Sequence, residues 1–180
     1  MITLIHASHR HGYCWLLIQK LKEQFANQTV DVQLVDLTAE NIEYCCGGQY
    51  CQETSCIHSD GFTSHLMQPL LESRCVFLVT PTYFDMPPAR LKNMIDRSNA
   101  VLPHISKEIS RYFGVWAIGE LETASILSNV EALKTYASVL GMQVTDELIR
   151  ISVVKGGEHK LTETDVYSVS EITTRILSLI

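Results

Sequence analysis

Two polar loops hold the residues best suited to chemistry, and the first lies near the start of the chain. It reads Ser8-His-Arg-His-Gly-Tyr-Cys14, and a helical pattern follows it. Backbone N–H groups and the positive end of a helix dipole favour an anion at such a place. An arginine can add two parallel hydrogen bonds to a phosphate. The loop therefore predicts a phosphate site at Ser8, Arg10 and Gly12, with a solvated turn as the alternative.

The second loop follows a continuous apolar run, Cys75-Val-Phe-Leu-Val79, which is typical of a strand buried on both faces. The loop begins Pro81-Thr-Tyr-Phe84 and so carries two adjacent aromatic side chains. Two prolines then lead into a helix, because proline is tolerated in a first turn. In an open α/β sheet, a loop at the carboxyl end of a strand is where a ligand binds.

Strand and helix patterns alternate along the rest of the chain. Strands are predicted at 2–7, 32–37, 75–79, 112–119 and 148–154, the last after a short extended piece at 143–144. Helices are predicted around 17–25, 63–73, 89–97, 126–140 and 166–179. Pro69 conflicts with an uninterrupted second helix, so we expect a kink or a short helix starting there. The alternation favours an α/β fold, a parallel sheet with helices on both faces, in a single domain over residues 1–180.

The amino-acid composition argues against two classes of partner, nucleic acids and membranes. The 180 residues are 46% hydrophobic and carry a formal net charge of -6, without a long run of lysine or arginine. This balance argues against nucleic acid as a partner, because phosphate backbones require a basic surface. No apolar segment approaches the roughly 20 residues of a membrane span, and the first residues are too short for a secretory signal. We therefore expect a cytoplasmic protein with no membrane partner.

The positions of the two loops together indicate a cofactor. They follow the first and third strands of the predicted sheet. Flavodoxin-like sheets have five parallel strands in the order 2-1-3-4-5 and bind flavin mononucleotide (FMN) between those two strands. A phosphate at residues 8–14 and a flat ring system at 81–84 describe FMN lying across that crevice. Neither G-x-G-x-x-G nor G-x-x-x-x-G-K-[ST] is present, so the dinucleotide and nucleoside triphosphate motifs are not indicated.

Both loops also match the motifs of a known family. Pro81-Thr-Tyr-Phe84 and Pro88-Ala-Arg-Leu-Lys-Asn-Met-Ile-Asp-Arg97 fit the pattern P-[VT]-Y-[FW]-x-x-x-P/S-A-x-L-K-x-F-I-D-R, and residues 8–14 fit S-P-R-x-G-N-[ST] at Ser8, Arg10 and Gly12. With these motifs the sequence resembles the NADPH-dependent FMN reductases, and within them the iron–sulfur flavoproteins. The resemblance covers most of residues 2–154. At Tyr13 and Cys14 the chain departs from the first motif.

This resemblance implies a function and a set of cofactor-binding residues. It implies an FMN-dependent oxidoreductase that takes a hydride from NAD(P)H and passes electrons to a quinone, a flavin or another small acceptor. It also implies a homodimer, and it requires no catalytic acid or base from a side chain. Tyr83 and Phe84 would flank the flavin ring, and backbone amides from Thr82 onward would bond its polar edge. The implied FMN-binding residues are Ser8, Arg10, Gly12, Tyr13, Cys14, Pro81, Thr82, Tyr83, Phe84 and Gly119.

The third loop at this edge departs from the family pattern. The family carries glycines after its fourth strand, whereas this chain reads Gly119-Glu-Leu-Glu122. Asp85, in the second loop, adds another negative charge near the expected flavin edge. Carboxylates there would oppose a negative charge on the flavin, since nearby charge tunes this cofactor. Two outcomes stay open: FMN binds weakly, or these side chains point into solvent.

Four cysteines, Cys45, Cys46, Cys51 and Cys56, lie in the irregular segment between residues 38 and 62. Iron–sulfur members of the family carry C-x-x-C-x-x-C with a fourth cysteine about five residues later, but here Gly48 takes the second position. Free thiols, an iron–sulfur cluster, and zinc bound with help from His58 are the alternatives. The sequence favours free thiols, and we assign no metal ligand.

Two alternatives to a reductase remain open from the sequence. The chain could be an electron carrier or redox sensor that uses the 45–56 loop, or a binding module without flavin. A reductase would turn over NAD(P)H with FMN bound, whereas neither alternative would. Iron and sulfide content separates the carrier from the binding module.

Overall fold

A five-stranded parallel sheet forms the centre of the molecule. The computed structural model describes residues 1–48, 50–53, 55–106, 108–120, 123–155 and 160–180. The strands lie in the order β2-β1-β3-β4-β5, and every neighbouring pair is parallel. This order confirms the predicted flavodoxin-like sheet. The strands are β1 (Ile2–His6), β2 (Val32–Asp36), β3 (Cys75–Pro81), β4 (Tyr112–Gly119) and β5 (Gln143–Val153).

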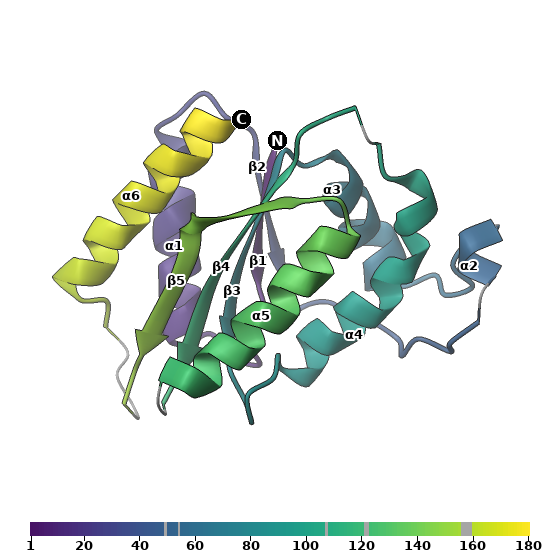
Figure 1. Ribbon diagram of the computed structural model, residues 1–180, viewed down its shortest axis with the longest axis horizontal. Helices are drawn as coiled ribbons and strands as arrows, with labels where there is room; N and C mark the ends of the chain where they lie inside the picture. Colours follow the sequence, from purple (N-terminus) through teal and green to yellow (C-terminus); the bar gives the residue numbers. More distant parts are fainter. Residues whose placement is uncertain (49, 54, 107, 121–122, 156–159) are drawn as a thin grey trace.

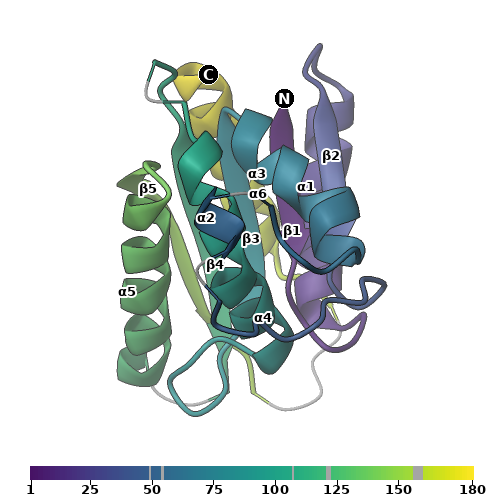
Figure 2. The same cartoon turned by 90° about the vertical axis from the view of Figure 1, so that its right-hand side faces the viewer.

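Helices cover both faces of this sheet, as Figures 1 and 2 show. One face is covered by α1 (Tyr13–Ala26) and α6 (Glu163–Leu179). The opposite face is covered by a π-helical turn (Phe62–Leu66), α3 (Met67–Glu72), α4 (Ala89–Arg97) and α5 (Thr123–Val139). The short helix α2 (Tyr50–Glu53) lies in the connection between β2 and α3, and 3-10 turns at Ser98–Ala100 and Leu102–His104 follow α4. Among the described residues, no helix is both long and apolar enough to cross a bilayer.

The central strand β3 explains why its sequence is a continuous apolar run. Phe77 and Val79 pack toward α1 and α6, whereas Val76 and Leu78 pack toward α4 and α5. All four side chains are at most 1% exposed. A parallel strand with helices on both faces needs apolar side chains at every position, because it has no solvent face.

Two elements differ from the sequence prediction. Helix α3 begins at Met67, so Pro69 lies in its first turn, where the missing N–H costs no helical hydrogen bond. The π-helical turn before it carries the chain into α3. Strand β5 is continuous from Gln143, with an irregular register: Phe113 pairs with Val144, and Val115 pairs with Ile149. Polar residues lie within this irregularity, and because of them the sequence pattern predicted two separate extended pieces.

Two helix ends have capping residues that suit their positions. Thr162 caps α6, because its hydroxyl accepts from the Asp165 amide at 3.2 Å while its own amide donates to the Asp165 carboxylate at 2.7 Å. This is a reciprocal capping box. Gly141 follows α5 with a φ of +67°, the left-handed conformation that favours glycine at a helix end.

A buried arginine ties the long β2–α3 connection to the body of the protein. Arg97, at the end of α4, is 2% exposed and contacts the Asp60 carboxylate at 2.6 Å. It also donates to the Glu43 carbonyl at 2.9 Å and to the Cys56 sulfur at 3.1 Å. Burial alone would raise the pKa of Asp60, but hydrogen bonds from Arg97 and from backbone amides outweigh it and lower the pKa to about 2. Asp60 is therefore a stable anionic partner for Arg97.

Replacing Arg97 by alanine should lower the free energy of unfolding by about 3–5 kcal/mol, because it leaves the Asp60 carboxylate buried without its partner. Urea unfolding of the two proteins measures the change. Lys92→Ala is the matched control: Lys92 and Asp96 form an exposed pair one turn apart on the same helix, and losing it should cost no more than about 0.5 kcal/mol. Equal costs for the two variants would contradict a buried role for Arg97.

Candidate functional site

The loops after β1, β3, β4 and β5 meet at the carboxyl edge of the sheet and enclose a cleft of about 580 Å³. From β1 the chain turns to α1 on one face, and from β3 it turns to α4 on the other face. Adjacent strands whose connections leave in opposite directions open a crevice between their ends, which is where α/β sheets bind ligands. The volume lies within the usual range for small-molecule sites.

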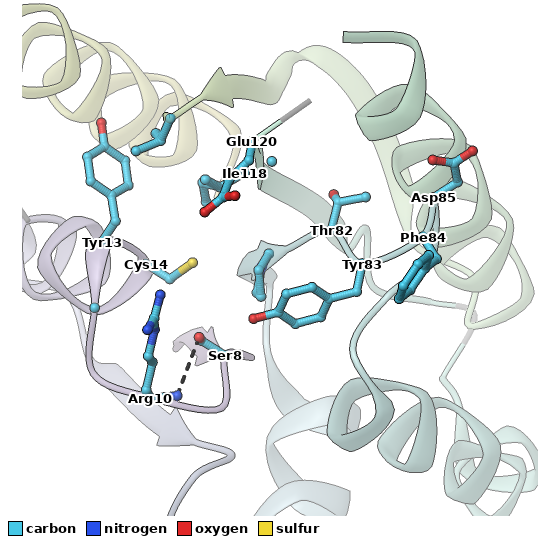
Figure 3. A pocket seen from close by; sticks show the side chains of 14 residues that line it. Ser8, Arg10, Tyr13, Cys14, Thr82, Tyr83, Phe84, Asp85, Ile118 and Glu120 are labelled. Atoms are coloured by element: carbon cyan, nitrogen blue, oxygen red, sulfur yellow. Dashed lines mark hydrogen bonds between the residues drawn. The ribbon is translucent and has the colours of Figure 1, made fainter. Parts of the chain in front are cut away.

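The first wall of the cleft is the loop between β1 and α1. Ser8 is buried, and its hydroxyl accepts from the Arg10 amide at 3.5 Å (Figure 3). Gly12 is the N-cap of α1 and offers no side-chain acceptor to the first turn of the helix. An anion in the cleft can therefore accept from the amides of this turn and from the Arg10 guanidinium.

Tyr13 and Cys14 contribute to this wall in different ways. The Tyr13 hydroxyl points away from the cleft toward α6, where it donates to the Asp165 carboxylate at 2.5 Å. The Cys14 side chain points into the cleft and is 5% exposed. Burial raises the pKa of this thiol to about 12, so it is neutral near pH 7. Neither side chain brings charge to the phosphate region.

A tight turn after β3 forms the second wall. Tyr83 and Met86 exchange two backbone hydrogen bonds of 3.0 Å, and Phe84 and Asp85 between them have φ angles of 50° and 64°. Residues other than glycine rarely adopt this left-handed conformation, at a cost of order 1–3 kcal/mol each. The turn leaves Phe84 94% exposed beside the cleft. Tyr83 stacks on the His9 ring of the first wall, with 5.7 Å between the ring centroids.

The backbone amides of the second wall are partly used by the protein itself. The Thr82 amide donates to the Ile118 carbonyl at 2.7 Å, and the Tyr83 amide donates to Met86. The Thr82 hydroxyl accepts from the Asn129 side chain at 2.9 Å. This differs from the expectation that amides from Thr82 onward face a flavin: the first two amides of the loop stabilise the sheet edge and the turn.

The third wall follows β4 and β5. A Cβ atom on Gly119 would lie 2.8 Å from Ile126 Cγ1, so this glycine permits the close approach of α5. The Glu120 carboxylate faces the cleft in Figure 3, whereas Glu122 lies outside the described residues. All ten residues predicted from the sequence line this cleft, and it also includes Asp85, Ile118, Glu120 and Val154. Ile118 and Val154 were missed, although they lie near the carboxyl ends of predicted strands.

The four cysteines of the 45–56 segment surround a separate small cavity. It measures about 20 Å³ and is also lined by His58 and Arg97. Burial and the neighbouring thiols raise the pKa of Cys51. This cavity shares no lining residue with the large cleft. All six cysteines of the chain are described, and none of them forms a disulfide.

A polar cluster lies behind the first wall, at the ends of β1 and β2. Asp36 accepts from His6 Nδ1 at 2.8 Å and from His11 Nε2 at 2.6 Å. Burial alone would raise the pKa of Asp36, but these bonds and those from Thr38 lower it to about 2. Burial lowers the pKa of His6, against the effect of Asp36. This cluster was not predicted from the sequence, although parallel pairing of the first two strands could have placed His6 beside Asp36.

The sheet order and the cleft between β1 and β3 define a flavodoxin-like α/β protein. The sequence profile of NADPH-dependent FMN reductase matches residues 1–152, so the chain belongs to this family. The match is to the family as a whole, and membership of its iron–sulfur branch stays a prediction. No curated protein matches the chain at the level of sequence.

Solved structures share the fold at low sequence identity. A flavodoxin, WrbA-like protein from Agrobacterium tumefaciens is 14% identical, with a TM-score of 0.70 over 99% of this chain and 94% of that one. RosB with bound 8-demethyl-8-formylriboflavin-5'-phosphate is 13% identical, with a TM-score of 0.75 over 99% and 79% of the two chains. A flavone reductase is 12% identical, with a TM-score of 0.72 over 98% and 62%.

Gly119→Ala should lower the free energy of unfolding by about 1–3 kcal/mol, because the new methyl group collides with Ile126. Removing the Ile126 side chain removes the collision. The double variant Gly119→Ala/Ile126→Ala should therefore be more stable than the sum of the single changes predicts, by at least about 0.5 kcal/mol. Urea unfolding of the four proteins gives this coupling energy, and strictly additive losses would contradict the contact.

Proposed function

We propose that this chain is an FMN-dependent NAD(P)H oxidoreductase, with residues 1–180 forming one cytoplasmic FMN-binding domain. The observation that carries the proposal is the cleft between β1 and β3. It brings an arginine and a helix N-terminus to face an aromatic turn, from segments about 70 residues apart in the sequence. Family membership supports FMN as the ligand.

The first wall suits the phosphate of FMN. Arg10 supplies a positive charge that can bind a phosphate through two hydrogen bonds. The Ser8 hydroxyl and the first-turn amides of α1 supply further donors. Cys14 stands where the family motif has a hydroxyl, and its neutral thiol is a weak donor. The phosphate therefore depends on Arg10 and on backbone donors.

The second wall suits the flavin ring. Pro81, Thr82, Tyr83 and Phe84 would flank it, and Gly119 would leave room at the third wall. The exposed ring of Phe84 offers an apolar surface that has no packing role in the single chain. An aromatic ligand would cover this surface and gain stacking energy. The turn that holds Phe84 is fixed by two backbone hydrogen bonds, so the surface is preorganised.

FMN would supply the chemistry, and the protein would determine where the cofactor lies. When bound, FMN accepts a hydride from a nicotinamide and passes the two electrons to a second substrate. The walls would hold and orient the ring, and the mouth of the cleft would stay open to a substrate. Glu120 brings a negative charge to the cleft, which opposes negative charge on a reduced flavin. This carboxylate would make the bound cofactor easier to oxidise.

Solved structures with this fold support a reductase. One of them is described as a flavone reductase and another as an azoreductase, and RosB holds a riboflavin phosphate derivative. Because the resemblance to the family implies a dimer, we propose a homodimer. Tyr83, Phe84 and Met86 form an exposed apolar edge at the mouth of the cleft, which a second copy would cover. The acceptor, a quinone, a flavin or another small molecule, would then bind between the two chains.

A second candidate function is electron transfer or redox sensing through the 45–56 segment. The observation that favours it is the gathering of four thiols around one cavity. In that case the flavin-loaded protein would exchange electrons with the thiol segment and would not consume NAD(P)H.

The test of the proposed function is anaerobic reduction of the FMN-loaded protein. Adding one equivalent of NADPH or NADH should bleach the visible flavin absorbance, and a quinone should restore it, because two electrons pass from the nicotinamide to the acceptor. Retained FMN that neither nicotinamide reduces would favour the electron-transfer candidate. A protein that retains no FMN after desalting would contradict both and point to a flavin-free binding module.

Arg10→Gln should separate phosphate binding from ring binding. Losing a charge-assisted bond of about 1.5–3 kcal/mol should weaken FMN binding roughly 10- to 150-fold. Riboflavin, which has no phosphate, should bind both proteins within about 2-fold. Fluorescence titration of the two flavins measures this. Lys22→Gln, an exposed change on the far part of α1, controls for net charge; an equal loss for riboflavin and FMN would contradict a phosphate role for Arg10.

A further inference from the structure

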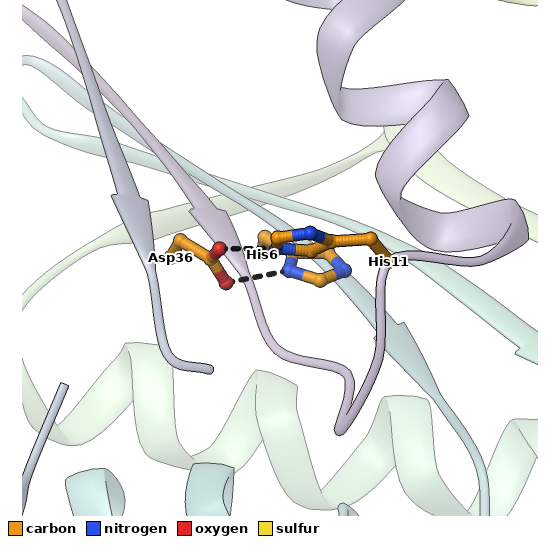
Figure 4. A group of neighbouring side chains, drawn as sticks. All are labelled: His6, His11 and Asp36. Carbon is orange, nitrogen blue, oxygen red and sulfur yellow. Dashed lines mark hydrogen bonds and ion pairs between the residues drawn. The ribbon is translucent and has the colours of Figure 1, made fainter. Parts of the chain in front are cut away.

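His6, His11 and Asp36 form a compact cluster outside the flavin cleft. His6 and Asp36 end neighbouring parallel strands and are direct partners in the ladder, so their side chains lie on the same face of the sheet. His11 comes from the loop before α1 and turns back onto the same carboxylate. Figure 4 shows both imidazole rings meeting the two oxygens of Asp36.

The three side chains offer a metal-binding donor set. One ligand atom from each, two imidazole nitrogens and one carboxylate oxygen, all lie within 4.8 Å of one another. Two histidines with one carboxylate is a set that zinc and neighbouring first-row ions accept, with a further position open to water. Bonds of about 2.1 Å to a tetrahedral ion place the donors about 3.4 Å apart. The hydrogen-bonded separations of 2.6 and 2.8 Å are shorter, so a shift of under about 1 Å by the carboxylate admits an ion.

Neighbouring residues already hold the rings and the carboxylate in place. Trp15 stacks on His11, with 4.0 Å between centroids, and meets His6 edge to face at 5.1 Å. The Thr38 hydroxyl lies 2.9 Å from each Asp36 oxygen and 3.2 Å from His11 Nε2. Contacts of this kind orient metal ligands and strengthen binding. The Thr38 hydroxyl is also close enough to bond a water at the open position.

The unpartnered nitrogen of His6 does not distinguish a metal-bound cluster from a metal-free one. His6 is fully buried, and its Nε2 atom has no hydrogen-bond partner within the described part of the chain. An ion bound at Nδ1 would leave Nε2 protonated and equally without a partner. The metal site therefore depends on the donor set itself and on the contacts that Trp15 and Thr38 make with it.

We propose that His6, His11 and Asp36 bind a divalent ion of the zinc class, with a water at the fourth position. The His11 side chain is 48% exposed, so an ion can enter from solvent past it. Through His11, the bound ion would link the loop between β1 and α1 to the end of β2. The site uses no residue that lines the cleft, so it stands independently of the proposed function.

Equilibrium dialysis of the full chain against micromolar zinc chloride, followed by metal analysis, tests the site. The cysteine segment can also bind zinc, so the informative quantity is the difference between matched proteins. His11→Gln should hold one equivalent of zinc less than the wild type, because only this site loses a ligand. His9→Gln is the control: it removes a histidine from the same loop, but His9 stacks on Tyr83 and is not in the cluster. It should hold as much zinc as the wild type.

Histidine ring signals in nuclear magnetic resonance spectra locate the ion directly. Zinc should shift the ring nitrogen signals of His6 and His11 in the wild type and leave those of His9 unchanged. Losing one of three ligands should weaken this site by more than the roughly 10- to 100-fold that losing a supporting contact costs. His11 is half exposed, so its replacement should leave the unfolding midpoint near that of the wild type. Equal zinc content in wild type and His11→Gln, or unshifted His6 and His11 signals, would overturn the proposal.

Discussion

The opposite directions in which the chain leaves β1 and β3 are the constraint on which the site depends. These strands are neighbours in the sheet, yet one leads to α1 on one face and the other to α4 on the opposite face. Within the described ranges, no crossover covers the gap between their carboxyl ends, so a cleft opens there. Its walls differ because one is a helix N-terminus and the other a strand-to-turn junction. A ligand with an anionic end and a flat apolar end matches both walls.

Local strain is concentrated around this cleft. Phe84 and Asp85 hold left-handed conformations without being glycine, and Phe84 is exposed although it is aromatic. Gly119 has no room for a side chain beside Ile126. Each feature runs against the preferences of an isolated sequence, and such conflicts are typical of positions where function outweighs stability. The rest of the sheet follows its preferences closely, as the apolar run of β3 illustrates.

Local patterns predicted the strands and helices, and the two loops that fit a flavodoxin-like crevice predicted the sheet order and the cleft. A buried parallel strand is a continuous apolar run, and the residues just after β1 and β3 must lie at one edge. Side-chain partners in irregular segments were not predictable in this way. The pairing of Arg97 with Asp60 depends on the path of an irregular connection. The continuity of β5 depends on a register irregularity that apolar spacing does not reveal.

The same reasoning explains why buried polar contacts matter for the loops of this protein. The loop that carries Arg10 has little regular structure, and its position is set by His11 against Asp36 and by Trp15. The backbone at Arg10 is therefore positioned by contacts within the protein, which would reduce the ordering cost of the proposed anion binding. In the same way, Arg97 helps to fix the position of the cysteine segment through its hydrogen bond to the Cys56 sulfur. The proposed anion site would thus depend on residues behind the loop, His11, Trp15 and Asp36, that do not line the cleft.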